Sequence, residues 1–342
     1  MRRRRRMSVK AIGYNREGDV GVLTELDLPR PTPGPRDLLV AVKAISVNPA
    51  DVKRRRFHKP DTAPDYTLLG NDAAGIVEAV GSEVSLFRPG DEVFYAGAMD
   101  RPGTNSEYHL VDERIVGPKP KSISFAEAAA MPLTSITAWE ILFDRMRIPY
   151  GSKSPSGTLL VLNGAGGVGS MMIQLATRLT GLTVIATASR PETVAWVRKL
   201  GAEHVADHRK PIDQAIRAIG FDGVDYIAAI TTTPGNVYPL VAALNPQGHI
   251  NFIDNFDESI FPFKAKSITI SWEMMFTRSL FQTADMDAQH RLLREVSALV
   301  DAGVLRSTMT QNMGRITLAN LRAAHEAVET ERTIGKVVLE GL

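Results

Sequence analysis

Short apolar runs separated by turn residues dominate the chain from residue 9 to about residue 116. The run at 37–47 (DLLVAVKAISV) is rich in branched apolar residues and follows a proline-rich loop, and similar runs lie at 75–84 and 91–95. Branched apolar residues between clusters of Gly and Pro are typical of strands. This part of the chain is predicted to be a compact β domain.

A different pattern begins at residue 158, where short strands alternate with amphipathic helices. Such alternation predicts a parallel sheet whose strands are joined by crossover helices. The predicted strands are 158–163, 183–187, 204–206, 224–229, 249–253 and 267–272. The fold class is therefore α/β, with a doubly wound parallel sheet beside the β domain.

Further helices are predicted in the segments that come before and after the parallel sheet along the chain. Ser124 and Glu127 form an S-x-x-E capping box before a helix that ends near residue 130, and a second helix is predicted at 134–146. After the sheet come amphipathic helices at 287–302 and 317–329 and a closing strand at 336–340. Because these last elements lie beyond the parallel sheet, we expect them to pack on the first domain.

Length and charge narrow the class of protein. A chain of 342 residues should form about two domains. The net charge is +2, from 40 Lys and Arg against 38 Asp and Glu, but five of the arginines form one run at residues 2–6. Without those five, the balance is 35 against 38. Residues 1–6 are predicted to be a disordered basic tail, either residues ahead of a start at Met7 or a tail that binds nucleic acid or a membrane surface.

Other classes of protein are excluded by what the sequence lacks. No apolar run approaches the roughly 18 residues that cross a bilayer, and no apolar stretch follows the arginines as it would in a secretory signal. The sequence contains no cysteine, which excludes disulfides, thiolate metal sites and cysteine nucleophiles. A protein without cysteine fits a reducing compartment, so a cytoplasmic location is expected.

A glycine-rich turn follows the first strand of the predicted parallel sheet. The strand at 159–162 runs into a G-x-G-x-x-G motif, and an amphipathic helix follows. Residues without side chains let the backbone approach a pyrophosphate, and the helix N-terminus offers free amide donors. The candidate dinucleotide-binding residues are Gly164, Gly166, Gly167, Val168 and Gly169.

The second strand of the sheet indicates which dinucleotide binds. An NAD site has an Asp or Glu at the end of this strand, where it accepts from the ribose 2′-hydroxyl. Here Ser189 and Arg190 stand there instead, a hydroxyl and a guanidinium that suit a 2′-phosphate, so we infer NADPH. Ser189 also fits a capping box with Glu192, which is compatible with phosphate binding. His208 ends the third strand and lies either beside the phosphate or simply exposed.

Six stretches of the chain carry a family resemblance. They are 46–53 (SVNPADVK), 72–97 (DAAGIVEAVGSEVSLFRPGDEVFYAG), 126–140 (AEAAAMPLTSITAWE), 163–170 (NGAGGVGS), 186–205 (ATASRPETVAWVRKLGAEHV) and 332–341 (RTIGKVVLEG). In these stretches the sequence resembles the medium-chain dehydrogenase/reductase superfamily, and most closely its quinone-oxidoreductase branch, in the zinc-type alcohol dehydrogenase-like subfamily. The resemblance implies a GroES-like β-barrel catalytic domain at 7–131 and 273–342, and a Rossmann domain that binds NADPH at 132–272.

The zinc site of this superfamily is not expected here. Zinc-dependent members use a Cys in the first domain and a G-H-E motif, but Asn48 stands in the place of that Cys and Asn71 and Asp72 replace the His and Glu. A catalytic zinc needs three protein ligands, and Asp72 alone supplies one. The resemblance therefore implies metal-free transfer of hydride from NADPH to a quinone or similar acceptor in the cleft between the domains.

The resemblance also implies roles for single residues. Asn48 and Asp51 match an N-P-x-D loop that lines the nicotinamide end of the cleft in relatives, although an Asx turn before Pro49 would also explain them. Thr137 matches a position that contacts cofactor in relatives, or it is a helix-interior hydroxyl. Arg332 is a candidate ligand of the cofactor phosphate. Asn71 stands where the close subfamily has an aromatic residue, so the acceptor pocket should differ in shape.

Several alternatives stay open at this point. An alkenal or enone double-bond reductase shares the scaffold and the hydride donor. A nucleic-acid-binding protein that uses the basic segments, including Lys53 to Arg56, is disfavoured. We expect that stretch to lie in a loop, either as a solvated face or as a selector of acidic substrates. A zinc alcohol dehydrogenase is the least favoured. A homodimer that pairs the 267–272 edge strands is expected from the family.

Overall fold

The computed structural model describes residues 8–59, 66–154, 157–231 and 235–341. The arginine run predicted to be a disordered tail lies outside these residues. The chain forms two compact units, one made of Met1–Leu133 and Phe276–Leu342 and the other of Thr134–Met275. The bounds expected from the sequence, 131/132 and 272/273, lie slightly earlier. Glu273 lies in the second unit, where its carboxylate accepts from Arg145 Nε at 2.8 Å.

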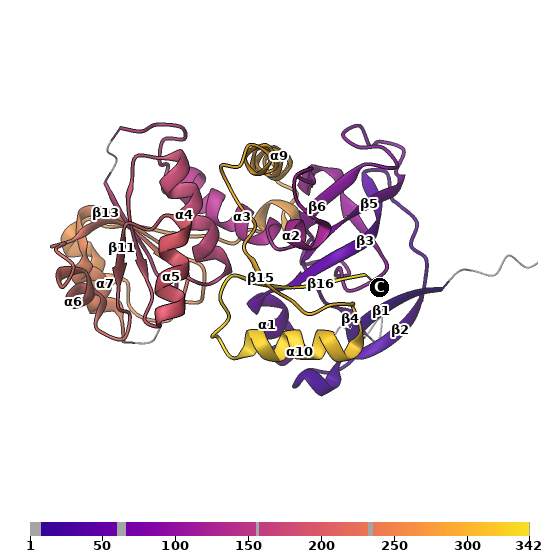
Figure 1. Ribbon diagram of the computed structural model, residues 1–342, viewed down its shortest axis with the longest axis horizontal. Coiled ribbons are helices and arrows are strands. Elements are labelled where there is room, and N and C mark those ends of the chain that lie inside the picture. Colours follow the sequence, from indigo (N-terminus) through magenta and orange to yellow (C-terminus); the bar gives the residue numbers. More distant parts are fainter. Residues whose placement is uncertain (1–7, 60–65, 155–156, 232–234, 342) are drawn as a thin grey trace, which may run out of the picture. The chain divides into compact units, whose positions relative to one another are not determined.

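The first unit is built mainly on antiparallel strands, with β15 and β16 paired in parallel (Figure 1). Its larger sheet has the order β15-β16-β3-β5-β6-β8, with β7 paired to β3, and a smaller sheet has the order β2-β1-β4. The strands are β1 (Ser8–Tyr14), β2 (Thr24–Pro29), β3 (Asp37–Val47), β4 (Thr67–Leu68), β5 (Asp72–Val80), β6 (Glu92–Ala96), β7 (Tyr108–Asp112), β8 (Val116–Pro118), β15 (Met309–Asn312) and β16 (Lys336–Glu340). Its helices are α1 (Pro49–Phe57), α2 (Phe125–Ala129), α8 (Thr277–Leu280), α9 (Ala288–Asp301) and α10 (Leu318–Glu329).

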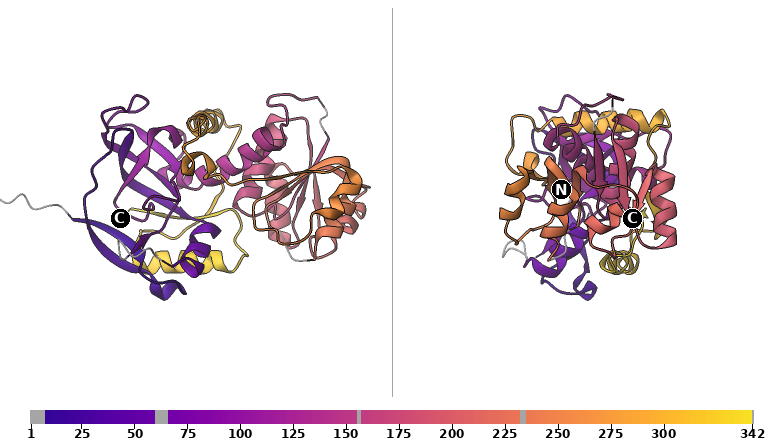
Figure 2. Two further views of the ribbon diagram at one scale, coloured as in Figure 1. Left: turned by 180° about the vertical axis from the view of Figure 1, so that it is seen from behind. Right: turned by 90° about the vertical axis from the view of Figure 1, so that its left-hand side faces the viewer.

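The end of the chain returns to this first unit. β16 pairs antiparallel with β3, with Val337 opposite Val47, and α10 packs against α1 and β16. Figures 1 and 2 show the yellow C-terminal segment against the indigo and purple N-terminal strands from opposite sides. Apolar residues of both segments share one core, in which Leu321 and Leu339 pack with Ile45 and Tyr95. The two ends of the chain therefore bury each other's apolar faces.

The second unit is a doubly wound parallel sheet. Within the described residues its strands have the order β11-β10-β9-β12-β13-β14, which places the first strand of the unit in the middle. Figure 1 shows α4 and α5 on one face of this sheet and α6 and α7 on the other. The strands are β9 (Thr158–Val161), β10 (Thr183–Thr187), β11 (His204–Ala206), β12 (Val224–Ala229), β13 (Leu244–Phe252) and β14 (Thr269–Trp272). The helices are α3 (Pro132–Trp139), which begins in the first unit, α4 (Gly167–Leu179), α5 (Pro191–Leu200), α6 (Ile212–Arg217) and α7 (Val237–Ala243).

Most predicted elements are present, with differences at particular ends. β5 begins at Asp72 rather than Gly75, because backbone pairing to β3 and β6 continues through Asp72. The helix predicted at 134–146 is α3 followed by a π-helical turn at Glu140–Arg145. The basic stretch at 53–56 was expected in a loop, and it lies on α1 instead. No helix among the described residues is both long and apolar enough to cross a membrane.

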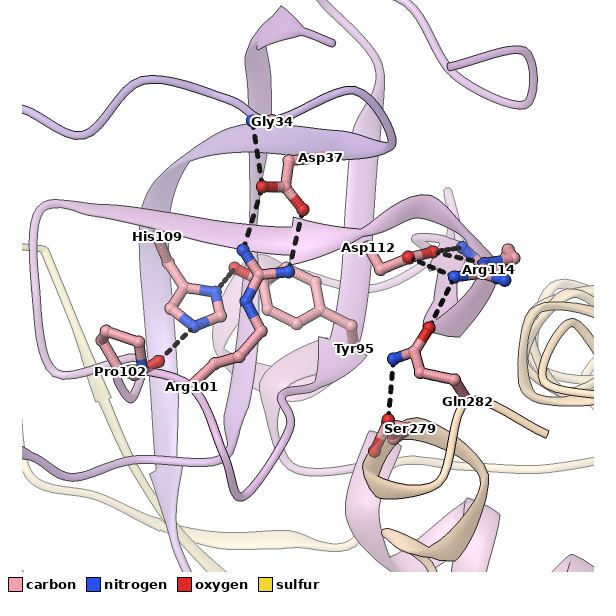
Figure 3. Close-up of polar contacts among 10 residues, drawn as sticks. All are labelled: Gly34, Asp37, Tyr95, Arg101, Pro102, His109, Asp112, Arg114, Ser279 and Gln282. Carbon is pink, nitrogen blue, oxygen red and sulfur yellow. Dashed lines mark hydrogen bonds and ion pairs between the residues drawn. The ribbon is translucent and has the colours of Figure 1, made fainter. Parts of the chain in front are cut away.

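A buried histidine links β7 to its neighbours in the first unit (Figure 3). His109 Nε2 lies 2.9 Å from the Pro102 carbonyl oxygen, and Nδ1 lies 3.1 Å from the Tyr95 hydroxyl. Because a carbonyl only accepts, Nε2 carries the proton and Nδ1 accepts from Tyr95. The two rings also stack, with centroids 5.4 Å apart. Burial lowers the pKa of His109 to about 4, so the ring is neutral at pH 7.

Candidate functional site

The glycine-rich turn of the second unit joins β9 to the N-terminus of α4. A Cβ on Gly169 would lie 2.4 Å from the Asn163 carbonyl oxygen, and one on Gly164 would lie 2.8 Å from the Ala186 Cβ. Only glycine therefore allows this close packing of helix on strand. The N-cap residue of α4 is Gly166, so no side chain covers the amides of Gly167, Val168 and Gly169.

The three residues expected at the adenosine end lie at the carboxyl ends of neighbouring strands. Ser189 follows β10, His208 follows β11, and Ser189 Oγ lies 2.9 Å from His208 Nε2. Arg190 is adjacent, and its guanidinium lies 3.3 Å from the Glu192 carboxylate. Burial lowers the pKa of His208. The second unit thus places a hydroxyl, an imidazole and a guanidinium next to one another.

One prediction about this region is wrong in detail. Ser189 was expected to cap α5 together with Glu192, but the N-cap is Arg190 and the side chain that bonds its backbone N–H is Thr193 Oγ1, at 3.1 Å. The Ser189 hydroxyl is therefore directed at His208 and not at the helix. This leaves it available to a ligand at the end of β10.

These residues fit a nicotinamide dinucleotide. The uncovered amides at the start of α4 suit a pyrophosphate, and the space that a Cβ at Gly169 would fill is what lets the backbone approach it. Thr137 is buried within α3. Arg332 is exposed in the loop between α10 and β16 of the first unit, where its N–H donates to Thr330 Oγ1 at 3.2 Å. Roles for Thr137 and Arg332 in cofactor binding stay predictions.

A buried polar cluster in the first unit contains the other predicted site residues. Asp51 accepts three hydrogen bonds, from Asn48 N at 2.8 Å, Asn71 Nδ2 at 2.8 Å and Gly70 N at 3.2 Å. Gly70 has φ +101°, and a Cβ there would lie 2.4 Å from Thr104 Oγ1, so glycine is required at this turn. The structure thus brings Asn48, Asp51 and Asn71 together.

A second carboxylate and a lysine complete this cluster. Asp72 accepts from Ser46 Oγ at 2.7 Å, Asn48 Nδ2 at 2.9 Å and the Leu133 backbone N–H at 2.7 Å. Lys336 Nζ, at the start of β16, donates to the Asn48 amide oxygen and to the Val47 carbonyl at 3.1 Å, and lies 3.3 Å from Asp72 Oδ2. The side chain of Asn48 therefore bridges Asp72 and Lys336.

Lys336 and Ser46 were not singled out in the sequence. Lys336 begins the run KVVLE, and the three residues after it are apolar. A charged residue at the start of a strand that is buried on both sides is the signal that could have identified it. Ser46 lies in the apolar run of β3 in the same way.

Burial dominates the electrostatics of the cluster. It raises the pKa of Asp51 to about 6. The hydrogen bond from the Asn48 backbone N–H and the positive charge of Lys336 oppose this shift, and the negative charge of Asp72 adds to it. Burial also lowers the pKa of Lys336, which Asp72 and Asp51 oppose. Asp51, with a pKa of about 6, is thus a carboxyl of this cluster that burial brings toward neutral pH.

The residues of this cluster do not fit a zinc ion. Catalytic zinc takes His, Cys or carboxylate ligands, three from the protein. Here two positions are the amides of Asn48 and Asn71, which are weak ligands, and the Lys336 ammonium already lies against Asp72. Within the described ranges, no three His, Cys, Asp or Glu side chains lie close enough together to hold a metal ion.

In the basic stretch of α1, Lys53 and Arg56 are exposed, as a solvated face predicts, but Arg55 is not. Arg55 is 0% exposed, its Nη1 donates to the Gly18 carbonyl at 2.8 Å, and its guanidinium pairs with Glu329 of α10. It is therefore neither part of a solvated face nor free to bind an acidic substrate. It holds α1 against α10 instead.

Comparisons with known proteins agree with this fold. Residues 34–136 match the alcohol dehydrogenase GroES-like domain family, and residues 200–339 match the zinc-binding dehydrogenase family. A zinc-type alcohol dehydrogenase-like protein of Staphylococcus aureus is 42% identical over 313 residues, 91% of this chain and 92% of that protein. An NADPH-dependent alkenal/one oxidoreductase of Arabidopsis thaliana is 37% identical and covers 70% of this chain and 64% of its own length.

Two solved structures are similar over nearly all of the chain. A proposed zinc-dependent alcohol dehydrogenase from Rhizobium etli is 50% identical, with a TM-score of 0.93 and 98% of each chain covered. A quinone oxidoreductase of Pseudomonas syringae pv. tomato is 25% identical, with a TM-score of 0.83 and coverage of 97% of this chain and 100% of that one. This chain therefore belongs to the medium-chain dehydrogenase/reductase superfamily, whose members are oxidoreductases that use a nicotinamide cofactor.

Proposed function

We propose that this protein is a metal-free, NADPH-dependent reductase that transfers hydride to a quinone or a similarly activated acceptor. The observation that carries the proposal is the donor set of the first unit's cluster. Where zinc-dependent relatives have metal ligands, this chain has two amides and an ammonium held by Asp72. Alcohol oxidation would lack its Lewis acid, whereas a quinone or enone already accepts hydride into a conjugated system.

The choice of NADPH rests on the group of residues that follows β10 and β11. A 2′-phosphate needs donors, and Ser189, Arg190 and His208 offer them without an Asp or Glu at the end of β10. When bound, NADPH supplies the hydride from its nicotinamide C4. The chain's own contribution is to hold the pyrophosphate at the N-terminus of α4 and the 2′-phosphate at Ser189 and Arg190.

On the acceptor side, Asn71 is the member of the cluster that we assign to the substrate. It is 9% exposed, more than Asn48, Asp51 or Asp72, and one of its two amide hydrogens is used by Asp51. The other hydrogen is suited to the acceptor oxygen, where negative charge develops as hydride arrives at carbon. A proton from water then completes the two-electron reduction.

The test is steady-state oxidation of NADPH with a panel of quinones and a panel of enones, on protein treated with a chelator. The proposal predicts quinone turnover that does not change with chelation. Protein that loses turnover on chelation and regains it with zinc would overturn the metal-free assignment. Arg217→Ala is the control for effects of substitution alone, because Arg217 is exposed on α6 and pairs with Asp213, away from both proposed sites.

A second candidate function is reduction of an alkenal or enone double bond. The relative from Arabidopsis thaliana, with its alkenal/one activity, favours it. Product analysis separates the two candidates, because an enone reductase yields a saturated carbonyl compound and leaves quinones unchanged. Turnover with enones alone would select this second function.

We further propose a homodimer and a cytoplasmic location. Among the described strands, β14 pairs only with β13, and Trp272 on this edge strand is 49% exposed. An open edge of this kind invites pairing with a second copy. Light scattering should therefore report a dimer, and Trp272→Lys should shift it toward monomer.

Binding of nucleic acid stays disfavoured, since Arg55 is buried in an ion pair.

A further inference from the structure

Lys336 is a buried cation for which the proposed reaction has no direct use. Its ammonium has three acceptors, namely the Val47 carbonyl, the Asn48 amide oxygen and Asp72 Oδ2. An ammonium has three hydrogens, so its donors are fully used. A lysine held in this way has none left for a substrate and can act only through its neighbours.

We propose that Lys336 is a positioning residue of the acceptor site, which keeps Asp51 ionised and thereby holds the Asn71 amide in one orientation. The inference rests on the proposed reductase function of that site. It extends the function by naming the group that makes the site dependent on pH.

The first step of the argument is geometric. Lys336 donates to the Asn48 amide oxygen, which leaves Asn48 Nδ2 to donate to Asp72 Oδ2 at 2.9 Å. The backbone N–H of the same Asn48 donates to Asp51 Oδ2 at 2.8 Å. One residue therefore connects the ammonium to both carboxylates.

The second step concerns Asn71. An ionised carboxylate only accepts hydrogen bonds, so Asp51 holds Asn71 with its NH₂ group toward Oδ1 at 2.8 Å. A neutral Asp51 carries a hydrogen and can donate it to the Asn71 amide oxygen. Asn71 is then no longer confined to one orientation, and the hydrogen that we assign to the acceptor is lost from its place.

The third step is the charge around Asp51. The charged groups that act on it are Lys336 from β16 and Asp72 from β5. On the helices packed against this region, Arg55 of α1 pairs with Glu329 of α10, and His325 of α10 is neutral because burial lowers its pKa to about 3. Lys336 is therefore the positive charge that opposes uptake of a proton by Asp51.

The experiment follows the protonated carboxyl of Asp51 by infrared difference spectroscopy as a function of pH, without any acceptor present. In the wild type, one carboxyl should titrate near pH 6, and Asp51→Asn should remove it. Lys336→Met should move that titration upward by about one pH unit, because the neutral variant lacks the positive charge that lowers the pKa of Asp51. Asp72→Asn should move it downward.

A matched control is Lys43→Met, which removes an exposed lysine from β3 of the same sheet and should leave the titration unchanged. Should Lys336→Met fail to fold, Lys336→Gln retains a donor for Asn48 without the charge, and the same upward shift is expected. A folded neutral variant that titrates as the wild type does would overturn the proposal.

Kinetics supply a second readout. The acidic limb of the pH profile of kcat/KM should move with the infrared titration in each variant. A merely structural role for Lys336 would lower activity at every pH without moving the limb. If no quinone or enone is reduced at all, the proposed function fails, but the infrared titration still decides whether Lys336 controls Asp51.

Discussion

Ser189 Oγ and His208 Nε2 lie 2.9 Å apart because their strands are in register. Thr187 of β10 pairs with Ala206 of β11, and each of the two polar residues lies two positions further along its own strand. Parallel strands end at the same edge of a sheet, which is where such folds bind their ligands. The pair therefore lies at the edge of the sheet where we propose that the adenosine end of the cofactor binds.

Replacing Arg190 should change the choice of cofactor. A hydrogen bond to a charged group contributes about 1.5–3 kcal/mol, so Arg190→Ala should raise the KM for NADPH about ten-fold or more. The KM for NADH should hardly change, since NADH has no 2′-phosphate. Initial rates with each cofactor give the ratio of the two KM values, and Arg217→Ala is the surface control. An equal loss with both cofactors would contradict the assignment.

A methyl group at Gly169 should abolish cofactor binding. Its Cβ would lie 2.4 Å from the Asn163 carbonyl oxygen and 2.7 Å from Gly164 Cα, and both are backbone atoms that cannot move aside cheaply. Fluorescence titration with NADPH should show no saturable binding for Gly169→Ala. The matched variant is Gly97→Ala, whose Cβ meets its nearest atom at an ordinary 3.6 Å, and it should bind as the wild type does. Normal binding of NADPH by Gly169→Ala would show that the pyrophosphate does not bind at this turn.

The ion pair between Arg55 and Glu329 should be costly to break from one side. Arg55 is fully buried, and removing Glu329 leaves its guanidinium without this ion pair, which costs about 3 kcal/mol in comparable pairs. Urea unfolding should show this loss for Glu329→Met. The double variant with Arg55→Met should recover much of it, because two apolar side chains replace the charges. Equal stabilities of the single and double variants would show that the pair carries no such coupling.

The sequence was sufficient to predict the parts of the fold that depend on local patterns. Strands such as Asp37–Val47 and Val224–Ala229 have the predicted bounds because branched apolar runs stand between turn residues. The G-x-G-x-x-G turn was also predicted, and Gly169 is required there by a backbone contact with the nearby Asn163.

Contacts between distant residues could not be predicted in this way. Lys336 and Asn48 are 288 positions apart, and only the pairing of β16 with β3 brings them together. Arg55 looked like one member of a solvated basic run, and its partner Glu329 lies on a helix near the other end of the chain. Whether a charged residue is buried can be judged only when its neighbours in space are known.

Acid should destabilise the protein through His109. Its pKa is about 4 in the folded state, against an ordinary value near 6.5, because burial disfavours the charged ring. The unfolded chain therefore binds a proton first, and stability that is fully present above pH 6.5 is lost as pH falls toward 4, by about 3 kcal/mol. Urea unfolding at a series of pH values measures this slope. Tyr95→Phe should leave the pH range of the loss in place, since Tyr95 only donates to the ring.

His325 offers a way to reduce this acid sensitivity. It is 0% exposed on α10, and within the described part of the chain neither ring nitrogen has a hydrogen-bond partner. Burial lowers its pKa to about 3. Its contribution to the free energy of unfolding is therefore also fully present above pH 6.5, and it is lost as the pH falls toward 3. His325→Leu removes both the unpartnered nitrogens and the proton uptake of the unfolded chain, and should stabilise the protein at pH 5 by about 1–2 kcal/mol. The gain should be smaller at pH 7.5, where both states are neutral, and a gain that does not depend on pH would assign the effect to packing alone.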